Sequence, residues 1–326
     1  MKALALLSGG LDSTLAVKLI QKQGIDVVAL NLTSPFYVYG KGERSAAEVA
    51  KQLKIPLKMI TLGKDYLEVL RNPKYGYGKN MNPCIDCRIF MLKKAKKYAE
   101  EIGVSFIFTG EVLNERPMSQ NRKALSLIEK EAGLEGKILR PLSAKLLPET
   151  EAEKKGWVDR EKLLGISGRS RKKQIELAKE FGVKDYPCPA GGCLLTYKEF
   201  ALKVKDLFEH KKKVETRDIN LLKIGRHFRF GKNKIIVGRN ENENKQLEKM
   251  RGKNGYFLEV PDCGSPITLL QGPKTKEALR KAAALTLRYS DKKEEKTLVH
   301  FGREKMDKSV VVSALDASEV EELRIK

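Results

Sequence analysis

The sequence predicts an α/β protein with a doubly wound parallel sheet, followed by a second, smaller α+β domain. Short apolar runs without polar alternation occur repeatedly in the first half, as expected for strands buried on both faces. Segments of helical periodicity separate these runs, and such βαβ repeats place ligands at the carboxyl ends of the strands. Beyond residue 217 the pattern changes to shorter strands with interleaved helices, which indicates the second domain.

The elements of the first half follow in order along the chain. We expect the first helix to begin at Asp12 or Ser13, directly after the first strand and a glycine turn. Strands are predicted over 3–7, 26–32, 57–62 and 104–110, and further helices over 45–50 and 89–102. The Lys/Glu-rich stretch 141–186 is predicted to be helical, with breaks at its glycines.

Three segments are expected along the chain: a first domain over 1–196, a basic linker over 197–217 and a second domain over 218–326. In the second domain, strands are predicted over 220–224, 234–237 and 256–260, and helices over 242–250 and 275–287.

Composition narrows the class of protein. The chain has 326 residues and a net charge of +22, which favours a polyanionic partner. No apolar run approaches the length of a membrane span and no signal-peptide pattern is present, so we expect a cytoplasmic protein that does not associate with a membrane. In that compartment the five cysteines indicate metal binding or redox chemistry more readily than disulfides.

The stretch Ser8-Gly9-Gly10-Leu11-Asp12-Ser13 joins the first strand to the first helix. A strand, a glycine turn and a helix N-terminus together direct free backbone N–H groups and the positive end of the helix dipole at one point, which is typical of a phosphate site. The alternative is an ordinary βα turn that binds no ligand, in which Ser and Asp only cap the helix.

Four cysteines form two close pairs, Cys84/Cys87 and Cys188/Cys193. The first pair lies at a predicted helix start, where the dipole and Arg88 are expected to lower the thiol pKa values. Three interpretations remain open: a [4Fe–4S] cluster held by Cys84, Cys87 and either Cys188 or Cys193, a structural Zn²⁺ site, and a persulfide relay. We rank the cluster first and the relay last. Cys263 is expected to be a buried structural thiol.

No G-x-x-x-x-G-K-[ST] motif occurs. The S-G-G-x-D-S loop instead resembles the PP-loop of the N-type ATP pyrophosphatases, which have a HUP-like fold. Together with the cysteine pairs it resembles the ATP-dependent tRNA thiolation enzymes, most closely the ThiI-type 4-thiouridine synthetases. The segment 109–120 is similar to that family's T-G-[ED]-x-x-G-Q-x-x-S-Q run, with Asn114 and Glu115 in place of Gly-Gln, and 139–142 matches L-R-P-L.

The resemblance implies an enzyme that adenylates a uracil carbonyl with ATP, releases pyrophosphate and transfers sulfur to tRNA. It implies Mg²⁺ beside Asp12, and a sulfur donor that is a cysteine desulfurase or inorganic sulfide. The residues with implied catalytic roles are Asp12, Cys84, Cys87, Cys188 and Cys193. Those implied for ATP binding are Ser8, Gly9, Gly10, Asp12, Ser13, Leu30, Asn31, Gly110, Gln120 and Arg140. Lys58 is a weaker candidate for a phosphate contact.

The stretch 237–244 resembles the V-G-[RK]-N-x-x-x-N signature of NFACT-R-type RNA-associated domains. Predicted RNA contacts are Arg169, Arg171, Lys172, Lys173, Lys211, Lys212, Lys213, Arg226, Arg229 and Arg239. Two other functions stay open: an amide-forming or lysidine-type PP-loop ligase, and a zinc-stapled RNA-binding protein. The sequence also leaves open whether the protein is a homodimer.

Overall fold

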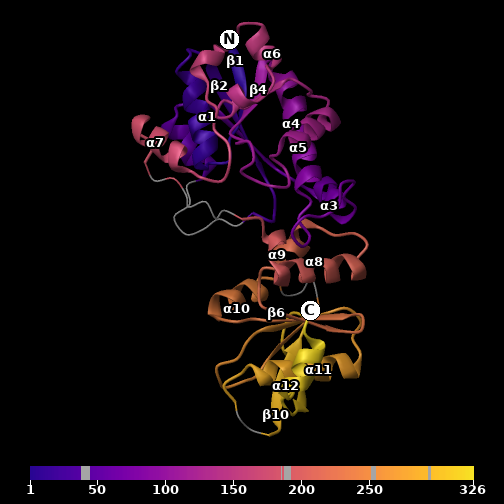
Figure 1. The fold of residues 1–326 in the computed structure, drawn as a ribbon. Helices are drawn as coiled ribbons and strands as arrows, with labels where there is room; N and C mark the ends of the chain where they lie inside the picture. Colours follow the sequence, from indigo (N-terminus) through magenta and orange to yellow (C-terminus); the bar gives the residue numbers. More distant parts are fainter. Residues whose placement is uncertain (38–44, 185, 187–191, 251–254, 293–294) are drawn as a thin grey trace. The chain divides into compact units, whose positions relative to one another are not determined.

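The protein consists of two compact units, Met1–Tyr197 and Lys198–Lys326. The computed structural model describes residues 1–37, 45–184, 186, 192–250, 255–292 and 295–326 (Figure 1). Each unit has its own sheet and its own apolar core.

The sheet of the first unit is parallel, with strand order β3-β2-β1-β4-β5. Its strands are β1 (Lys2–Leu6), β2 (Asp26–Thr33), β3 (Leu57–Thr61), β4 (Phe106–Thr109) and β5 (Ile138–Leu139). The order reverses between β1 and β4. In a doubly wound sheet this switch point opens a crevice at the carboxyl ends of the strands, which is where a ligand is expected.

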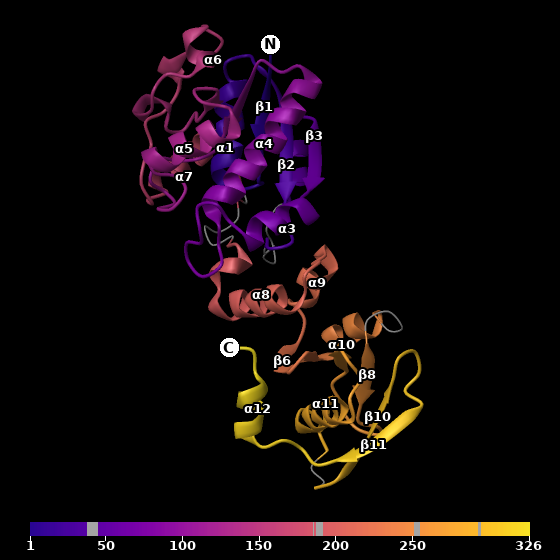
Figure 2. The same ribbon diagram turned by 90° about the vertical axis from the view of Figure 1, so that its right-hand side faces the viewer.

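The central strands are buried on both faces, as their unbroken apolar sequences predict. Ala3 and Ala5 of β1 pack with α1 (Leu11–Gln21), α2 (Ala46–Gln52) and α6 (Glu151–Lys154). Leu4 points to the opposite face and packs with α4 (Cys84–Ile102) and α5 (Arg122–Ala132). The alternation of side chains along β1 therefore produces the two helical layers seen on either side of the sheet (Figures 1 and 2).

Two further helices complete the first unit. Helix α3 (Lys64–Arg71) packs against α4, and α7 (Lys172–Glu180) packs against α1. Short 3₁₀ turns lie at Ala144–Leu146, Arg160–Lys162 and Leu194–Thr196.

The second unit has a six-stranded antiparallel sheet with the order β11-β10-β8-β9-β7-β6. One face packs against α11, and the other packs with residues of α9 and α10. The strands are β6 (Arg226–Phe230), β7 (Asn233–Val237), β8 (Tyr256–Glu259), β9 (Thr268–Gln271), β10 (Thr297–Gly302) and β11 (Lys308–Val312). The helices are α8 (Lys198–His210), α9 (Thr216–Leu221), α10 (Glu241–Glu248), α11 (Lys276–Arg288) and α12 (Ala317–Leu323). The predicted fold class is confirmed.

Some local predictions were wrong. The stretch 220–224 is not a strand, because Glu215 and Asp218 form a reciprocal capping box that starts α9 at Thr216. The stretch 197–217, expected to be a linker, is largely helical because Val204 and Leu207 of α8 are buried. The region 141–186 contains only α6 and α7 as α-helices in its described part. Within the described ranges, no helix is both long and apolar enough to cross a membrane.

Candidate active site

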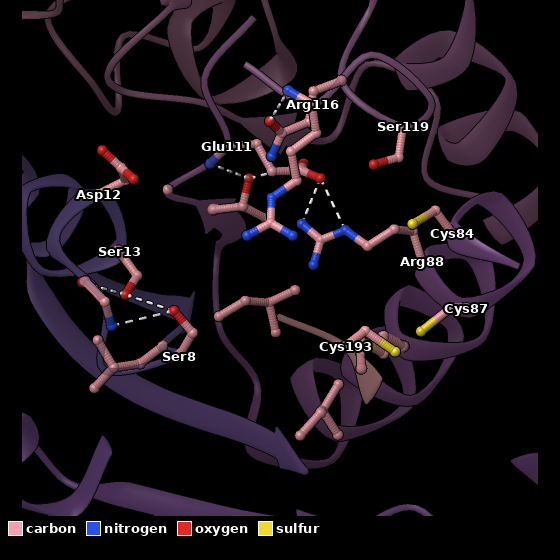
Figure 3. Close-up of a pocket in the computed structure, with 18 of the residues that line it drawn as sticks. Ser8, Asp12, Ser13, Cys84, Cys87, Arg88, Glu111, Arg116, Ser119 and Cys193 are labelled. Carbon is pink, nitrogen blue, oxygen red and sulfur yellow. Dashed lines mark hydrogen bonds and ion pairs between the residues drawn. The ribbon is translucent and has the colours of Figure 1, made fainter. Parts of the chain in front are cut away.

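The loop after β1 has the geometry of an anion nest. Gly9 adopts a left-handed φ of 86°, and Gly10 precedes the first residue of α1 without a side-chain cap, so N–H groups of the first helical turn stay available. The Ser8 and Ser13 hydroxyls lie 3.1 Å apart, and the Ser13 hydroxyl donates to the Gly10 carbonyl at 2.9 Å (Figure 3). The loop is thus ordered by its own serines, while its amides can still bind an anion.

Gly110, at the end of β4, lies directly against this loop. A Cβ at Gly110 would come within 2.4 Å of the Ser13 backbone nitrogen and 2.6 Å of the Asp12 carbonyl carbon. These contacts are with backbone atoms that cannot move without distorting α1. Gly110, which the resemblance implies for ATP binding, is therefore also required for packing of the phosphate loop.

The cysteines form another wall of the same cavity. Cys84 is the first residue of α4 and Cys87 follows one turn later. Cys193 is brought beside them by an antiparallel bridge to Tyr37 and by the bond from the Leu194 amide to the Phe36 carbonyl, 2.9 Å. All three are free thiols that line one cavity (Figure 3).

The thiol pKa values differ from the sequence-based expectation. Burial raises the pKa of Cys84 and of Cys87, and the nearby Arg88 offsets this only in part. Burial raises the pKa of Cys193 to about 12. Arg88 lowers the pKa values of Cys84 and Cys87 as expected, but removal from water has the larger effect, so the net shift is upward. At neutral pH all three are protonated thiols.

Arg88 forms an ion pair with Glu111. Its Nε donates to Glu111 Oε1 at 2.9 Å, and a second guanidinium nitrogen contacts the same oxygen. Glu111 Oε2 accepts from Arg140 Nε at 3.1 Å and from the Thr109 hydroxyl at 3.0 Å. Burial alone would raise the pKa of Glu111, but the two guanidinium groups more than offset this and lower it to about 2. This network ties α4 to β4.

Arg140 is part of that network. Its side chain is 3% exposed, pairs with Glu111 and Glu129, and does not line the cavity. The contacts of Arg140 are structural, and its predicted role in ATP binding stays a prediction. Lys58 is exposed on the edge strand β3 and also lies outside the cavity lining.

Asp12 differs from Glu111. Its Oδ1 atom is buried and has no hydrogen-bond partner among the described residues. Burial raises the pKa of Asp12, although Arg171 and Arg116 act in the opposite direction. Glu115 lines the same cavity, and its pKa is raised by burial and by the charge of Asp12. An unsatisfied buried carboxylate oxygen with a second carboxylate in range fits a hard divalent cation such as Mg²⁺.

The cavity has a volume of about 290 Å³ and lies at the carboxyl ends of β1, β2 and β4. It brings together nearly all of the predicted ATP and sulfur residues that the structure describes. These are Ser8, Gly9, Gly10, Asp12, Ser13, Leu30, Asn31, Cys84, Cys87, Gly110, Gln120 and Cys193. Cys188 lies outside the described residues.

Some of these residues also hold the site together. The Asn31 side-chain amide donates to the Leu7 carbonyl at 2.8 Å, which joins β2 to the start of the phosphate loop. Gln120 Oε1 accepts from the Arg116 amide at 3.0 Å. Both side chains therefore shape the cavity through backbone contacts.

Sequence reasoning missed several residues of the cavity, in particular Arg116, Tyr37, Tyr66 and Ser119. Arg116 and Ser119 follow the strand end at Gly110, so their position after a carboxyl end of the sheet was the available signal. Tyr66, whose hydroxyl donates to Cys87 Sγ at 3.1 Å, comes from α3 and had no such signal.

The predicted RNA contacts of the first unit lie in two different environments. Arg171 lines the cavity, and its buried Nε has no partner among the described residues. Arg169, Lys172 and Lys173 are exposed around the start of α7.

In the second unit, most predicted RNA contacts have partners inside the fold. Arg229 pairs with Asp206, Arg239 with Glu243 and Lys211 with Asp218. Arg226 lies 4.5 Å from the centre of the Tyr289 ring, and Lys212 and Lys213 are exposed. Arg229 and Arg239 are thus held by carboxylates of their own unit, and their predicted contacts with RNA stay predictions.

A parallel sheet with an anion nest at its switch point is the arrangement expected of a nucleotide-binding α/β domain. Residues 1–145 match the family described as thiamine biosynthesis protein (ThiI), and residues 225–324 match the NFACT protein RNA binding domain. The first unit thus matches the ThiI family model and the second the NFACT model, which confirms the resemblance to the PP-loop tRNA thiolation family.

Individual relatives agree with this assignment. A probable tRNA sulfurtransferase of Thermococcus kodakarensis is 30% identical over 149 residues, which are 43% of this chain and 36% of the relative. The tRNA-specific 2-thiouridylase MnmA of Xanthobacter autotrophicus is 27% identical over 222 residues, 62% of this chain and 53% of the relative. The chain thus spans about a third to a half of the length of these relatives.

A crystal structure of a 4-thiouridine synthetase–RNA complex with bound ATP matches with a TM-score of 0.38 and 22% identity. That match covers 68% of this chain and 52% of the other.

Proposed function

We propose that this protein is an ATP-dependent tRNA sulfurtransferase that forms AMP and pyrophosphate. The observation that carries the proposal is that one cavity contains both a phosphate-binding loop and three free cysteines. ATP-dependent amide formation needs only the first of these features. Sulfur transfer needs both, because a carbonyl oxygen must be activated before sulfur can replace it.

The phosphate loop supplies the nucleotide half of the site. The first-turn amides of α1 and the dipole of that helix stabilise the negative charge of the departing pyrophosphate. The adenine would pack against Leu30 and Asn31 in the carboxyl-terminal half of β2, which line the cavity together with Gly110. Mg²⁺, held by Asp12 with Glu115 in range, would neutralise charge on the leaving phosphates.

The cysteine wall supplies the sulfur half. Cys84, Cys87 and Cys193 offer three soft thiol ligands, although the described residues contain no group of three acidic, His or Cys side chains compact enough to hold a metal ion as they stand. A [4Fe–4S] cluster bound by three cysteines would hold sulfide at the iron atom that has no protein ligand. Since the thiols are protonated, binding of iron or Zn²⁺ would release protons.

The RNA half of the proposal rests on the second unit and on the charge of the chain. The NFACT-type domain, the net charge of +22 and the exposed Arg169, Lys172 and Lys173 beside the cavity support a tRNA substrate held through its phosphates. The cysteine desulfurase or inorganic sulfide that supplies sulfur is part of this proposal.

The test is an anaerobic preparation incubated with ATP, Mg²⁺, sulfide and unmodified tRNA. Thiolated nucleosides are measured by mass spectrometry of digested tRNA, and pyrophosphate release and bound iron and zinc are measured in parallel. We expect C84A and C87A to lose thiolation by at least about 100-fold while keeping ATP binding. C263A is the matched control, because Cys263 lies in the second unit and packs against its core.

Each outcome separates the alternatives. Iron lost together with thiolation supports the cluster, and zinc lost together with fold stability supports a structural site. Lost thiolation without a change of metal supports a persulfide relay. Full activity of the cysteine variants in an amine-dependent reaction would instead identify an amide-forming ligase.

A further inference from the structure

Arg116 is held at its backbone more firmly than its exposed position suggests. The Arg116 amide donates to Gln120 Oε1 at 3.0 Å, and the Gln120 amide donates to the Arg116 carbonyl at 2.9 Å. Gln120 itself is buried, and its carbonyl accepts from the Asn114 amide at 2.8 Å. Asn114 turns the chain with a left-handed φ of 62°. These bonds close the loop and fix the point from which the Arg116 side chain extends.

The Arg116 side chain extends into the cavity. Figure 3 shows its guanidinium in the space between Asp12 and Ser13 on one side and the cysteine sulfurs on the other. Within the described residues it forms no ion pair with a carboxylate, whereas Arg88 is held by two contacts with Glu111. Arg116 therefore lies between the phosphate loop and the cysteine wall.

The reaction proposed above requires a phosphate at this place. The loop Ser8–Ser13 receives pyrophosphate, and sulfur comes from the cysteine wall. The group between them is the α-phosphate, which joins AMP to the activated carbonyl oxygen. A guanidinium stays charged at any physiological pH and binds phosphate oxygens through two parallel N–H donors.

We propose that Arg116 binds the α-phosphate of the nucleotide and stabilises AMP as the leaving group, an inference that rests on the proposed function. In the first step the carbonyl oxygen forms a bond to the α-phosphorus, the neighbouring ring nitrogen loses its proton to solvent, and the α–β bridging bond breaks with its electron pair leaving on pyrophosphate. In the second step sulfide forms the C–S bond, and the C–O bond breaks with its electron pair leaving on AMP. The sulfide proton moves to the ring nitrogen. Sulfur remains at the sulfide oxidation level, so neither step needs an oxidant or a reductant.

The test separates phosphate contacts by using parts of the nucleotide as probes. AMP, adenosine and pyrophosphate are each titrated calorimetrically into the full-length wild type and into R116Q, R116K and R122Q. Arg122 is the matched control, because it is exposed at the start of α5 and does not line the cavity. We expect R116Q to weaken AMP binding about 10- to 100-fold, as for loss of a charge-assisted contact. Adenosine and pyrophosphate affinities should stay within about 2-fold.

R116K should recover part of the AMP affinity, because it keeps the charge and loses the fork of donors. In turnover assays R116Q should lower kcat for AMP formation while KM for tRNA changes little. Unchanged AMP affinity in R116Q, or no AMP binding by the wild type, would overturn the assignment. Weaker tRNA binding with unchanged AMP binding would show that Arg116 contacts an RNA phosphate instead. A wild type that binds AMP through Arg116 but never thiolates tRNA would refute the proposed function alone.

Discussion

Glu111 and Asp12 are two carboxylates of one cavity with opposite electrostatic environments. Glu111 accepts from Arg88, Arg140 and Thr109, and its pKa falls to about 2. Asp12 keeps an unpaired buried oxygen, and its pKa is raised by burial. A paired buried charge holds elements of the fold together. An unpaired buried charge destabilises the folded protein when no ligand is bound, and such a charge is retained where a bound ligand supplies its partner.

The largest expected effect is at Glu111. E111Q removes the carboxylate that the partly buried Arg88 shares with the buried Arg140, and of these two only Arg140 keeps a second carboxylate partner, Glu129. We therefore expect the free energy of unfolding to fall by about 3–5 kcal/mol. Because folding lowers the pKa of Glu111 from an ordinary 4.5 to about 2, its contribution is complete above pH 4.5 and is lost as the pH falls toward 2. Urea unfolding of the wild type should show this dependence, and E111Q should show it less.

The single tryptophan of the chain, Trp157, lies in the first unit and reports its unfolding by fluorescence. E161Q is a matched control, since Glu161 pairs with Lys145 while 86% exposed, and its loss should change stability by less than about 1 kcal/mol. Equal losses in E111Q and E161Q would contradict the distinction between buried and exposed pairs.

The second unit offers a parallel case with a smaller effect. Asp206 accepts from Arg229 at 2.8 and 2.7 Å and from Lys234 at 3.0 Å. Burial opposes its ionisation, but these cations more than offset it and lower the pKa of Asp206. We expect D206N to destabilise the second unit by about 2–3 kcal/mol, with the wild-type advantage lost as the pH falls below the ordinary 3.8.

In urea unfolding followed by circular dichroism, the second unit of D206N should unfold at a lower urea concentration than that of the wild type. The transition of the first unit, followed by Trp157 fluorescence, should not change. A shift of both transitions together would mean that the two units do not unfold independently. Weaker tRNA binding by D206N without any loss of stability would instead support the predicted contact between Arg229 and RNA.

The smallest change in stability is expected at Asp12, with the opposite sign. Folding raises the pKa of Asp12, so the ionised group disfavours the folded state at neutral pH and D12N should be neutral or stabilising by no more than about 0.5 kcal/mol. Mg²⁺ should raise the melting temperature of the wild type and not that of D12N. ATP-to-AMP turnover should nearly vanish in D12N. A loss of stability like that of E111Q would show that Asp12 is structural.

Local patterns determined much of the fold before any contact was known. Apolar runs and helical periodicity located β1, β2, β3 and β4 and four helices to within a few residues, because burial of an element leaves a direct trace in the sequence. The phosphate loop and the cysteine pairs were likewise visible, because each requires particular residue types at short spacing.

The roles of the arginines were decided only by the tertiary structure. The sequence shows that Arg88, Arg116, Arg140 and Arg171 are charged, and it gives no sign of which will meet a carboxylate. Packing of α4 and β4 places Glu111 between Arg88 and Arg140, which makes those two structural. The closed loop at Gln120 points Arg116 into the cavity, and α7 brings Arg171 to its lining. Long side chains pair with residues of elements that are far apart in the chain, and local periodicity in the sequence does not indicate which residues will pair.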